Sequence, residues 1–383
     1  RGRLRSGYEP LVALIVPLKG LEPGLDLNLK AFATQDYVAY QLILVVASAG
    51  DPVYRWVNER VNALPAAAPR NACTIRIVVA GRSETRGEKV NNLLAGVAAA
   101  DPAAQVFVFA DSDATPGPDW LRSLVAPLAA SRMTLSTGFR WYLPGPGLAS
   151  QLRAAWDTSV ATMLGAHDHN FAWGGSTAIR ASDFKRLEVA ERYWASTVSD
   201  DYALTRAVRE RGGFDAGGGP AQETPGRIHF EPRCLVKSGG ELSLAQFLRW
   251  ANRQIIITRV YSPRLWWMGL LSYLLYCGTF IFGLTLLAMG AGSGAGRLAV
   301  AGLLAAVVAM GMIKAGVRTV VAREQFGGEE ASLQRYGSRY WQLSPLVPWV
   351  MLFNFAVAAF VRRIEWRGVR YELRSANEVR VLK

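Results

Sequence analysis

The feature that most restricts the fold is an uncharged apolar segment at residues 265–289. It contains no Asp, Glu, Lys or Arg from Leu265 to Met289. A helix needs about 20 apolar residues to cross a bilayer, and uncharged apolar runs of at least that length predict a transmembrane helix. We therefore predict an integral membrane protein in which this segment is the first C-terminal membrane helix.

Two further apolar segments follow. Residues 298–317 are apolar as far as Lys314, whose long side chain can reach the membrane interface. Residues 345–361 are uncharged, but they carry Pro345 and Pro348 in the first turn, and the segment is at the lower limit of length for spanning. We predict that this third segment is re-entrant or steeply broken.

The residues on either side of these segments are basic. Residues 241–264 carry Arg249, Arg253 and Arg259 at helical intervals among apolar residues, which predicts an amphipathic helix in the headgroup plane. Residues 362–383 form a basic tail, and Lys and Arg favour the cytoplasmic side. We expect residues 366–371 to return to that side, against the interfacial helix.

Residues 1–240 alternate between short apolar strands and helical patterns. Such alternation predicts a doubly wound, mostly parallel α/β sheet, which binds ligands at the carboxyl ends of its strands. Strands are expected at 11–16, 41–47, 74–80, 105–110 and 133–139, and helices at 25–34, 55–64, 89–99, 119–130, 147–164 and 203–211.

Two carboxylates one residue apart follow the strand at 105–110. Asp111 and Asp113 lie at its carboxyl end, and side chains at i and i+2 of an extended segment point the same way. Both can therefore face one hard cation and one diphosphate. Surface loops contain many such pairs, so this motif alone is weak evidence.

Other polar motifs stand in a suggestive order along the chain. Asp200 and Asp201 precede a helix, where acidic residues also serve as caps. Gln246, Arg249 and Trp250 lie just before the first membrane segment, where Arg and Trp also anchor helices at the interface. The combined order and spacing favours a catalytic site over these separate explanations.

Composition restricts the partners. The net charge is +13, yet the sequence has no Lys/Arg-rich run of the nucleic-acid-binding kind, so no nucleic acid partner is expected. The three cysteines are scattered, which argues against a disulfide framework or a zinc site. The chain opens on Arg1, and we expect that a membrane segment preceded it.

These motifs together resemble those of membrane-bound, inverting nucleotide-sugar glycosyltransferases of the GT-A type. Within that group the chain is similar to ceramide glucosyltransferases, of the family 2/21 type. The similarity runs through residues 17–20, 50–52, 89–93, 111–113, 200–202, 246–250 and 366–371.

The resemblance implies roles for individual residues. Asp201 is the expected catalytic base, and Asp113 with Asp111 is expected to hold Mg²⁺ or Mn²⁺. The diphosphate and acceptor are expected at Gln246, Arg249 and Trp250. The nucleotide sugar is expected at Asp51, Lys89, Asn92, Asp111, Gly174, Gly175 and Asp200. In many related transferases an Asp directly follows the second strand, but here residues 47–49 are Ala-Ser-Ala.

The expected reaction is transfer of a sugar from a UDP-sugar to the hydroxyl of a membrane lipid. Glucose is the first candidate for the sugar, and ceramide is the first candidate for the lipid. Alternatives are glycosylation of a hopanoid or diacylglycerol, or a processive polysaccharide synthase, for which three apolar segments are few. A transporter or scaffold with an inactive sugar-binding domain is a further alternative, against which both acidic pairs argue. The catalytic domain is expected in the cytoplasm, at a bacterial inner membrane or a Golgi/ER-type membrane.

Overall fold

The computed structural model describes residues 7–61, 72–213, 225–327 and 330–382. The chain divides into two compact units. The sheet unit consists of residues 1–140, 163–238 and 365–383, and the helical unit of residues 141–162 and 239–364. The sheet unit thus contains most of the predicted catalytic domain, residues 1–240, and also takes in the C-terminal tail.

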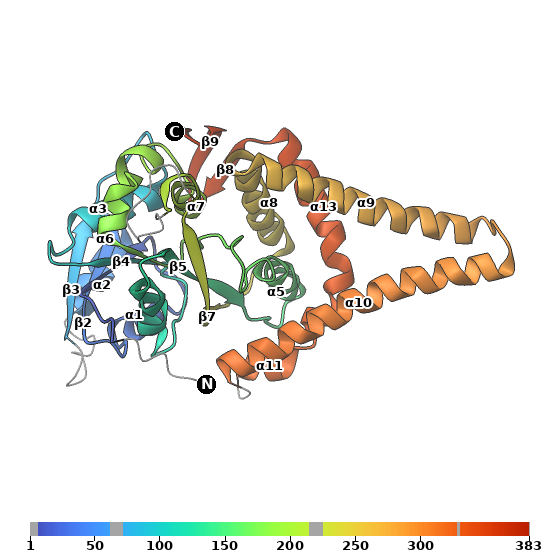
Figure 1. Cartoon of the computed structure of the whole chain (residues 1–383), viewed down its shortest axis with the longest axis horizontal. Coiled ribbons are helices and arrows are strands. Elements are labelled where there is room, and N and C mark those ends of the chain that lie inside the picture. The colour runs from blue at the N-terminus through green and yellow to red at the C-terminus, as the bar shows by residue number, and fades with distance from the viewer. Residues whose placement is uncertain (1–6, 62–71, 214–224, 328–329, 383) are drawn as a thin grey trace. The chain divides into compact units, whose positions relative to one another are not determined.

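A seven-stranded sheet organises the first unit, with strand order β3-β2-β1-β4-β6-β5-β7 (Figure 1). Strands β1 to β4 are parallel, and β6 runs antiparallel to β4 and β5. The first half consists of β1 (Val12–Leu18), α1 (Leu25–Ala33), β2 (Ala39–Val46), α2 (Pro52–Arg60), β3 (Ala72–Val79), α3 (Glu88–Ala98) and β4 (Val106–Ala110). The second half consists of α4 (Trp120–Val125), β5 (Met133–Tyr142), β6 (Ser176–Arg180), α6 (Ala181–Arg186), α7 (Asp200–Arg211) and β7 (Arg227–Ser238).

Helices cover both faces of this sheet, and the alternation of strand side chains explains why. In β1, Val12 and Leu14 belong to one buried cluster with residues of α1, α2 and α4. Ala13 and Ile15 belong to a second cluster with residues of α3 and α7. A parallel strand buried on both faces reads as a continuous apolar run. The predicted doubly wound α/β class is therefore confirmed.

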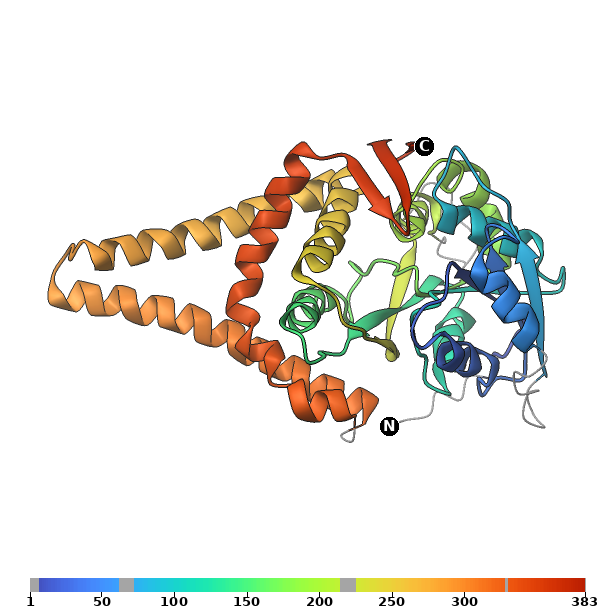
Figure 2. The same cartoon turned by 180° about the vertical axis from the view of Figure 1, so that it is seen from behind.

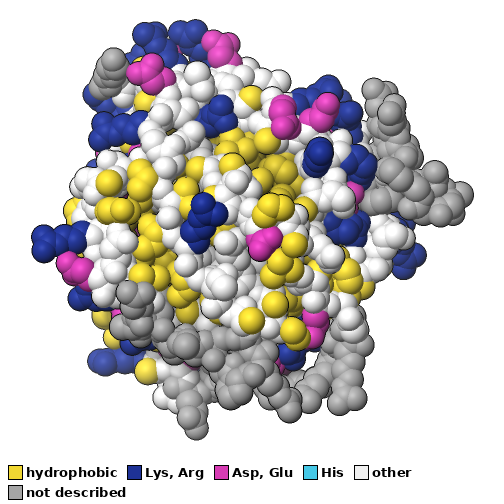
Figure 3. Space-filling model, turned by 90° about the vertical axis from the view of Figure 1, so that its left-hand side faces the viewer, with side chains coloured by type: hydrophobic (Ala, Val, Ile, Leu, Met, Phe, Trp, Pro, Cys, Tyr) yellow, Lys and Arg dark blue, Asp and Glu magenta, His cyan; other side chains and the backbone are white. Residues whose placement is uncertain are grey.

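Strand β3 forms one edge of the sheet. Its side chains are half-buried or exposed in alternation, and Arg76 donates from it to the carbonyl of Ala99 at 2.7 Å. Figure 3 views the molecule from this side and shows hydrophobic side chains in patches between scattered Lys and Arg. Charged groups on an edge strand disfavour its pairing with another chain.

The helical unit contains α5 (Leu148–Ala161), α8 (Leu244–Tyr261), α9 (Pro263–Ala288), α10 (Gly294–Phe326), α11 (Ala331–Tyr336), α12 (Arg339–Gln342) and α13 (Val347–Phe360). Helices α9 and α10 form a long hairpin (Figures 1 and 2). Three stretches, α9, α10 and Arg339–Phe360, are long and apolar enough to cross a membrane. They agree with the three predicted apolar segments.

Asn354 fixes α13 within this unit. It is completely buried, accepts from Trp156 Nε1 of α5 at 3.1 Å and donates to Asn252 of α8 at 2.7 Å. Arg259 of α8 also donates to the carbonyl of Ala358 at 2.6 Å. Because a buried amide is stable only when hydrogen-bonded, these contacts tie α13 to α5 and α8.

The last strands, β8 (Arg363–Trp366), β9 (Val369–Ser375) and β10 (Glu378–Leu382), form a separate three-stranded sheet, which we call the C-terminal meander. The sequence predicts a basic tail at residues 362–383 and no strands there. Strands β6 and β7 were also not predicted.

Candidate active site

The two carboxylates after β4 meet a single guanidinium, that of Arg140 at the end of β5. Its Nη2 lies 2.7 Å from Asp111 Oδ2 and 2.8 Å from Asp113 Oδ1, and its Nη1 lies 3.1 Å from Asp113 Oδ2. Only 12% of the Arg140 side chain is exposed. Both carboxylates therefore contact one cation that the protein itself supplies. The metal ion expected at Asp111 and Asp113 stays a prediction.

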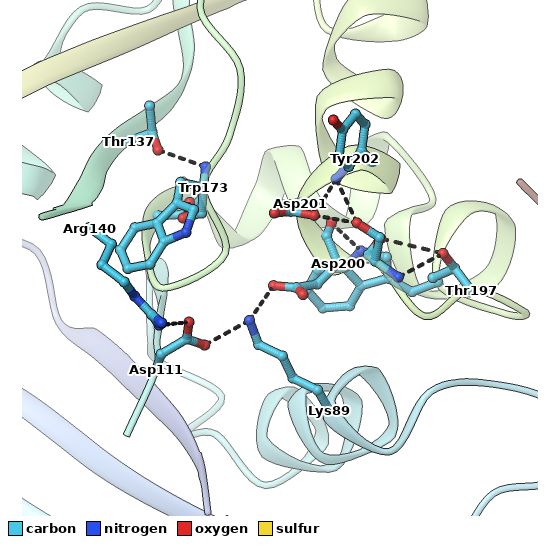
Figure 4. Close-up of polar contacts among 12 residues, drawn as sticks. Lys89, Asp111, Thr137, Arg140, Trp173, Thr197, Asp200, Asp201 and Tyr202 are labelled. Atoms are coloured by element: carbon cyan, nitrogen blue, oxygen red, sulfur yellow. Dashed lines mark hydrogen bonds and ion pairs between the residues drawn. The ribbon is translucent and has the colours of Figure 1, made fainter. Parts of the chain in front are cut away.

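Lys89 connects the two acidic motifs. From the first turn of α3 its Nζ reaches Asp111 Oδ1 at 2.7 Å and Asp200 Oδ2 at 3.1 Å (Figure 4). The ends of β4, α3 and α7 therefore converge on one ammonium group, although residues 111 and 200 are far apart in the sequence.

Burial and charge set the protonation of Lys89, Asp111 and Asp200, which we call the Lys89 triad. Burial raises the pKa of Asp111, but the Lys89 and Arg140 cations outweigh it and lower that pKa to about 2. Burial also raises the pKa of Asp200, to about 7, because Lys89 only partly compensates and the neighbouring carboxylates oppose ionisation. For Lys89 burial lowers the pKa, yet Asp111 and Asp200 raise it overall. The site therefore holds a fixed anion, a fixed cation and one carboxyl that titrates near neutral pH.

Gly174 and Gly175 make room for these carboxylates. A Cβ on Gly174 would lie 1.9 Å from Asp200 Oδ2, and one on Gly175 would lie 2.7 Å from Asp111 Oδ2 and 2.2 Å from the Trp173 ring. Trp173 in turn lies under the guanidinium of Arg140, 5.1 Å from ring centroid to Cζ. At these two glycines the backbone therefore lies close to the carboxylates of the acidic site, and their contact with a nucleotide sugar stays a prediction.

Asp201 lies beside the triad in the first turn of α7. Its Oδ1 accepts hydrogen bonds from the backbone N–H of Tyr202 at 2.8 Å and from the hydroxyl of Ser199. In the described chain these bonds are all on Oδ1, and the side chain is partly exposed. By contrast Asp200 is only 3% exposed. Asp201 is therefore the carboxylate of this pair that a substrate can reach.

Of the two other residues predicted to bind the nucleotide, Asp51 has a structural role and Asn92 is buried. Asp51 caps α2 by accepting from Val53 N at 2.9 Å, and it accepts from Gly20 N at 3.0 Å. Asn92 is 2% exposed in α3, one turn after Lys89. Their contacts with a nucleotide stay predictions.

The Gln246 to Trp250 motif lies on α8 of the helical unit. Gln246 forms a capping box with Ser243 at the start of the helix. Trp250 packs edge-on against Tyr142 and Trp156, with ring centroids 5.5 and 5.1 Å apart. Arg249 is exposed on the same helix. Their expected roles toward diphosphate and acceptor stay predictions.

The sequence predicts no site role for Arg140, Glu22 or Arg367, although Arg367 lies within residues 366–371, which carry part of the family resemblance. Glu22, between β1 and α1, accepts from the hydroxyl of Ser112 at 2.9 Å and pairs with Arg367 at 2.6 Å. Arg140 was detectable in principle, because its strand was predicted to end one residue earlier. Glu22 and Arg367 meet only through the fold, and no local pattern signals their contact.

The donors at Asp111 and Asp113 fit a divalent cation that binds together with a phosphate. Mg²⁺ usually takes one or two carboxylates plus substrate phosphates rather than a complete protein cage. The described residues contain no group of three or more His, Cys, Asp or Glu that could hold an ion, so metal binding at Asp111 and Asp113 stays a prediction. Asp113 is 31% exposed, so an entering phosphate can approach it.

The acidic site lies at the carboxyl end of β4 in a mostly parallel sheet, and the chain also has three apolar stretches long enough to cross a membrane. Residues 3–379 match the model of glycosyltransferase family 21, and the chain belongs to that family. The match covers both units. The predicted family resemblance and the GT-A fold class are thereby confirmed, and the enzyme is a glycosyltransferase.

Two solved structures are similar to the chain. A mannosyltransferase from Pyrobaculum calidifontis, in complex with GDP-Man and Mn²⁺, is 16% identical over 92% of this chain and 86% of that one, with a TM-score of 0.47. Glucosyl-3-phosphoglycerate synthase from Mycobacterium tuberculosis is 14% identical over 65% and 79%, with a TM-score of 0.38. The family assignment rests on the sequence match.

The raised pKa of Asp200 predicts a pH-dependent effect of Asp200→Asn on stability. Asp200 has a folded pKa of about 7 and a model value of 3.8, so its contribution to stability is present below about pH 4 and lost as the pH rises to about 7. Without donor or metal, the melting temperature of the variant relative to wild type should therefore rise across this window. Thermal unfolding at a series of pH values measures it.

The control for this experiment is Asp26→Asn, which removes an exposed carboxylate that is paired with Lys30. Its melting temperature relative to wild type should not follow the same pH window. A constant difference for Asp200→Asn between pH 4 and 7 would contradict the raised pKa.

Proposed function

We propose that this enzyme transfers a sugar, glucose as the first candidate, from a UDP-sugar to the hydroxyl of a membrane lipid, ceramide as the first candidate. The observation that carries the proposal is the Lys89 triad, with Asp201 beside it, in a chain that also has three long apolar helices. Family membership supports sugar transfer, and the apolar helices support an acceptor that lies in the bilayer.

The residues around Asp111 suit the departure of a diphosphate. As the bond between C1 of the sugar and the diphosphate breaks, negative charge develops on the leaving oxygen. A divalent cation, held by Asp113 and Asp111, would offset this charge when bound. In the structure all four oxygens of these two carboxylates contact Lys89 or Arg140, so Arg140 would have to share or release carboxylate oxygens when a cation binds.

Asp201 suits the attacking side of the reaction. An acceptor hydroxyl is a weak nucleophile, and a carboxylate within reach takes its proton as the new oxygen–C1 bond forms. The hydrogen bonds of Asp201 use Oδ1, which leaves Oδ2 for this proton. Attack opposite the leaving group inverts the configuration at C1. Gln246, Arg249 and Trp250 are proposed to act near the diphosphate and acceptor.

The reaction can be tested on the purified protein in lipid. With UDP-glucose, ceramide and Mg²⁺ or Mn²⁺, mass spectrometry should detect glucosylceramide, and excess EDTA should stop its formation. GDP-mannose as donor and diacylglycerol as acceptor are the matched alternatives. Product formation only from these alternatives would refute the proposed substrates, and full turnover in EDTA would refute the metal.

Asp201→Asn should lower transfer by about 100-fold or more, which is the usual contribution of a general base. UDP-sugar binding should stay within a few fold, because the amide keeps Oδ1 and its hydrogen bonds. Single-turnover rates and donor titrations measure the two effects. Asp119→Asn, the same change at the start of α4, is the control. A variant that kept more than about a tenth of the rate would exclude Asp201 as the base.

We also propose that the catalytic unit and the tail share the cytoplasmic side. The hydroxyl of Tyr371 accepts from Glu88 N at 3.2 Å, and residues 365–383 belong to the sheet unit. The chain therefore crosses the membrane an even number of times between α8 and β8. The third apolar stretch, Arg339–Phe360, is long enough to cross only if it is continuous, but a 3-10 turn at Ser344–Leu346 separates α12 from α13. Helix α13 alone has 14 residues, about 21 Å at 1.5 Å per residue, against a hydrocarbon core of about 30 Å. Helices α9 and α10 are the proposed crossings, and α13 is re-entrant.

A cysteine at Ser375, in a protein without its three native cysteines, tests this topology. An impermeant maleimide should label it only after the membrane is opened. A cysteine at Ala291, between α9 and α10, should be labelled in intact cells. Labelling of both positions in intact cells would indicate three full crossings and an external tail.

A further inference from the structure

The C-terminal meander contacts the segments that build the acidic site. Arg367 pairs with Glu22 in the β1–α1 loop at 2.6 Å. Tyr371 binds the first backbone N–H of α3, directly before Lys89. Asn377 accepts from Arg206 of α7. All of these residues belong to the sheet unit, so the meander is part of the site's surroundings.

Arg367 has an unusual backbone conformation. With Gly368 it forms the two-residue turn between β8 and β9, and the φ angles are +48° and +77°. Two-residue hairpin turns require such angles and favour Asn or Gly there. An arginine in the left-handed region is strained, because its Cβ lies close to the following carbonyl oxygen. Strain of this kind concentrates at functional sites, which points to a use for the side chain.

The guanidinium of Arg367 is connected to the acidic pair through one intervening side chain, that of Glu22. Its partner Glu22 accepts from Ser112, which lies between Asp111 and Asp113. The group is therefore within electrostatic reach of the place where the diphosphate of the donor is proposed to bind.

The guanidinium of Arg367 can donate further hydrogen bonds. A guanidinium has five N–H donors, and in the described chain Nη2 contacts Glu22 while Nη1 donates weakly to the carbonyl of Lys19 at 3.5 Å. Its side chain is 32% exposed. An entering phosphate can therefore bind without breaking the pair with Glu22, and guanidinium forks suit phosphate oxygens well.

We propose that Arg367 binds the diphosphate of the nucleotide sugar, so that the C-terminal meander completes the donor site. This inference rests on the proposed function. It adds a donor-binding residue from the end of the chain, beyond the apolar helices. The alternative is that the Arg367–Glu22 pair only fastens the meander to the sheet unit.

The test compares UDP with uridine, which lacks the phosphates, by titration calorimetry in Mg²⁺ without acceptor. Arg367→Gln should weaken UDP binding by about 10-fold or more, as expected for a hydrogen bond to a charged group, and leave uridine binding within about two fold. The donor KM should rise more than kcat falls, and Arg367→Lys should recover part of the affinity. Arg374→Gln, which removes an exposed arginine of the same meander, should change neither.

Glu22→Gln separates the two roles. It breaks the same ion pair but keeps the guanidinium, so UDP binding should be retained or tightened. If the ion pair only holds the meander to the sheet unit, Glu22→Gln and Arg367→Gln should weaken the binding of UDP and of uridine equally. That result would overturn the inference. Unchanged UDP binding in Arg367→Gln would also overturn it, while the proposed function would stand. If wild-type protein bound no UDP, the proposed UDP donor and this inference would fall together.

Discussion

The acidic site depends on one buried cation, the ammonium group of Lys89. It lies between Asp111 and Asp200, which come from opposite halves of the sheet unit. Removing one member of a buried ion pair typically costs about 3–5 kcal/mol, because it leaves a charge without compensation. Here the loss would leave two carboxylates facing each other. Lys89 therefore both joins α3, β4 and α7 and makes their acidic ends compatible.

The surrounding backbone is fitted to the same arrangement. Gly174 and Gly175 leave the volume that the carboxylates occupy, and Arg140 neutralises the side of Asp111 that Lys89 does not reach. Both features reduce the same unfavourable effect, which is the repulsion and desolvation of several carboxylates close together in a mostly buried site. The same concentration would attract a divalent cation and a phosphate together, so stability and proposed chemistry rest on one set of contacts.

The sequence predicted the parts of the fold that repeat a simple pattern. Strands β1, β2 and β4 are continuous apolar runs, and Asp111, Lys89 and Asp200 lie at element ends, where ligand sites are expected. Strand β7 escaped prediction because it contains Pro232 and several charged residues. Strand β6 is short and follows two glycines. The pair between Glu22 and Arg367 has no local signal, since only the completed fold brings the two residues together.

The return of residues 365–383 to the sheet unit has a consequence for synthesis of the protein. Chains fold largely as they emerge from the ribosome, beginning at the N-terminus. The parts of the sheet unit up to Ser238 are made early, but their last partner strands are made after α9, α10 and α13. Contacts as distant as Glu88 with Tyr371 form late and slowly. The sheet unit is therefore finished only after the apolar helices of the helical unit have been made, which couples its maturation to their insertion.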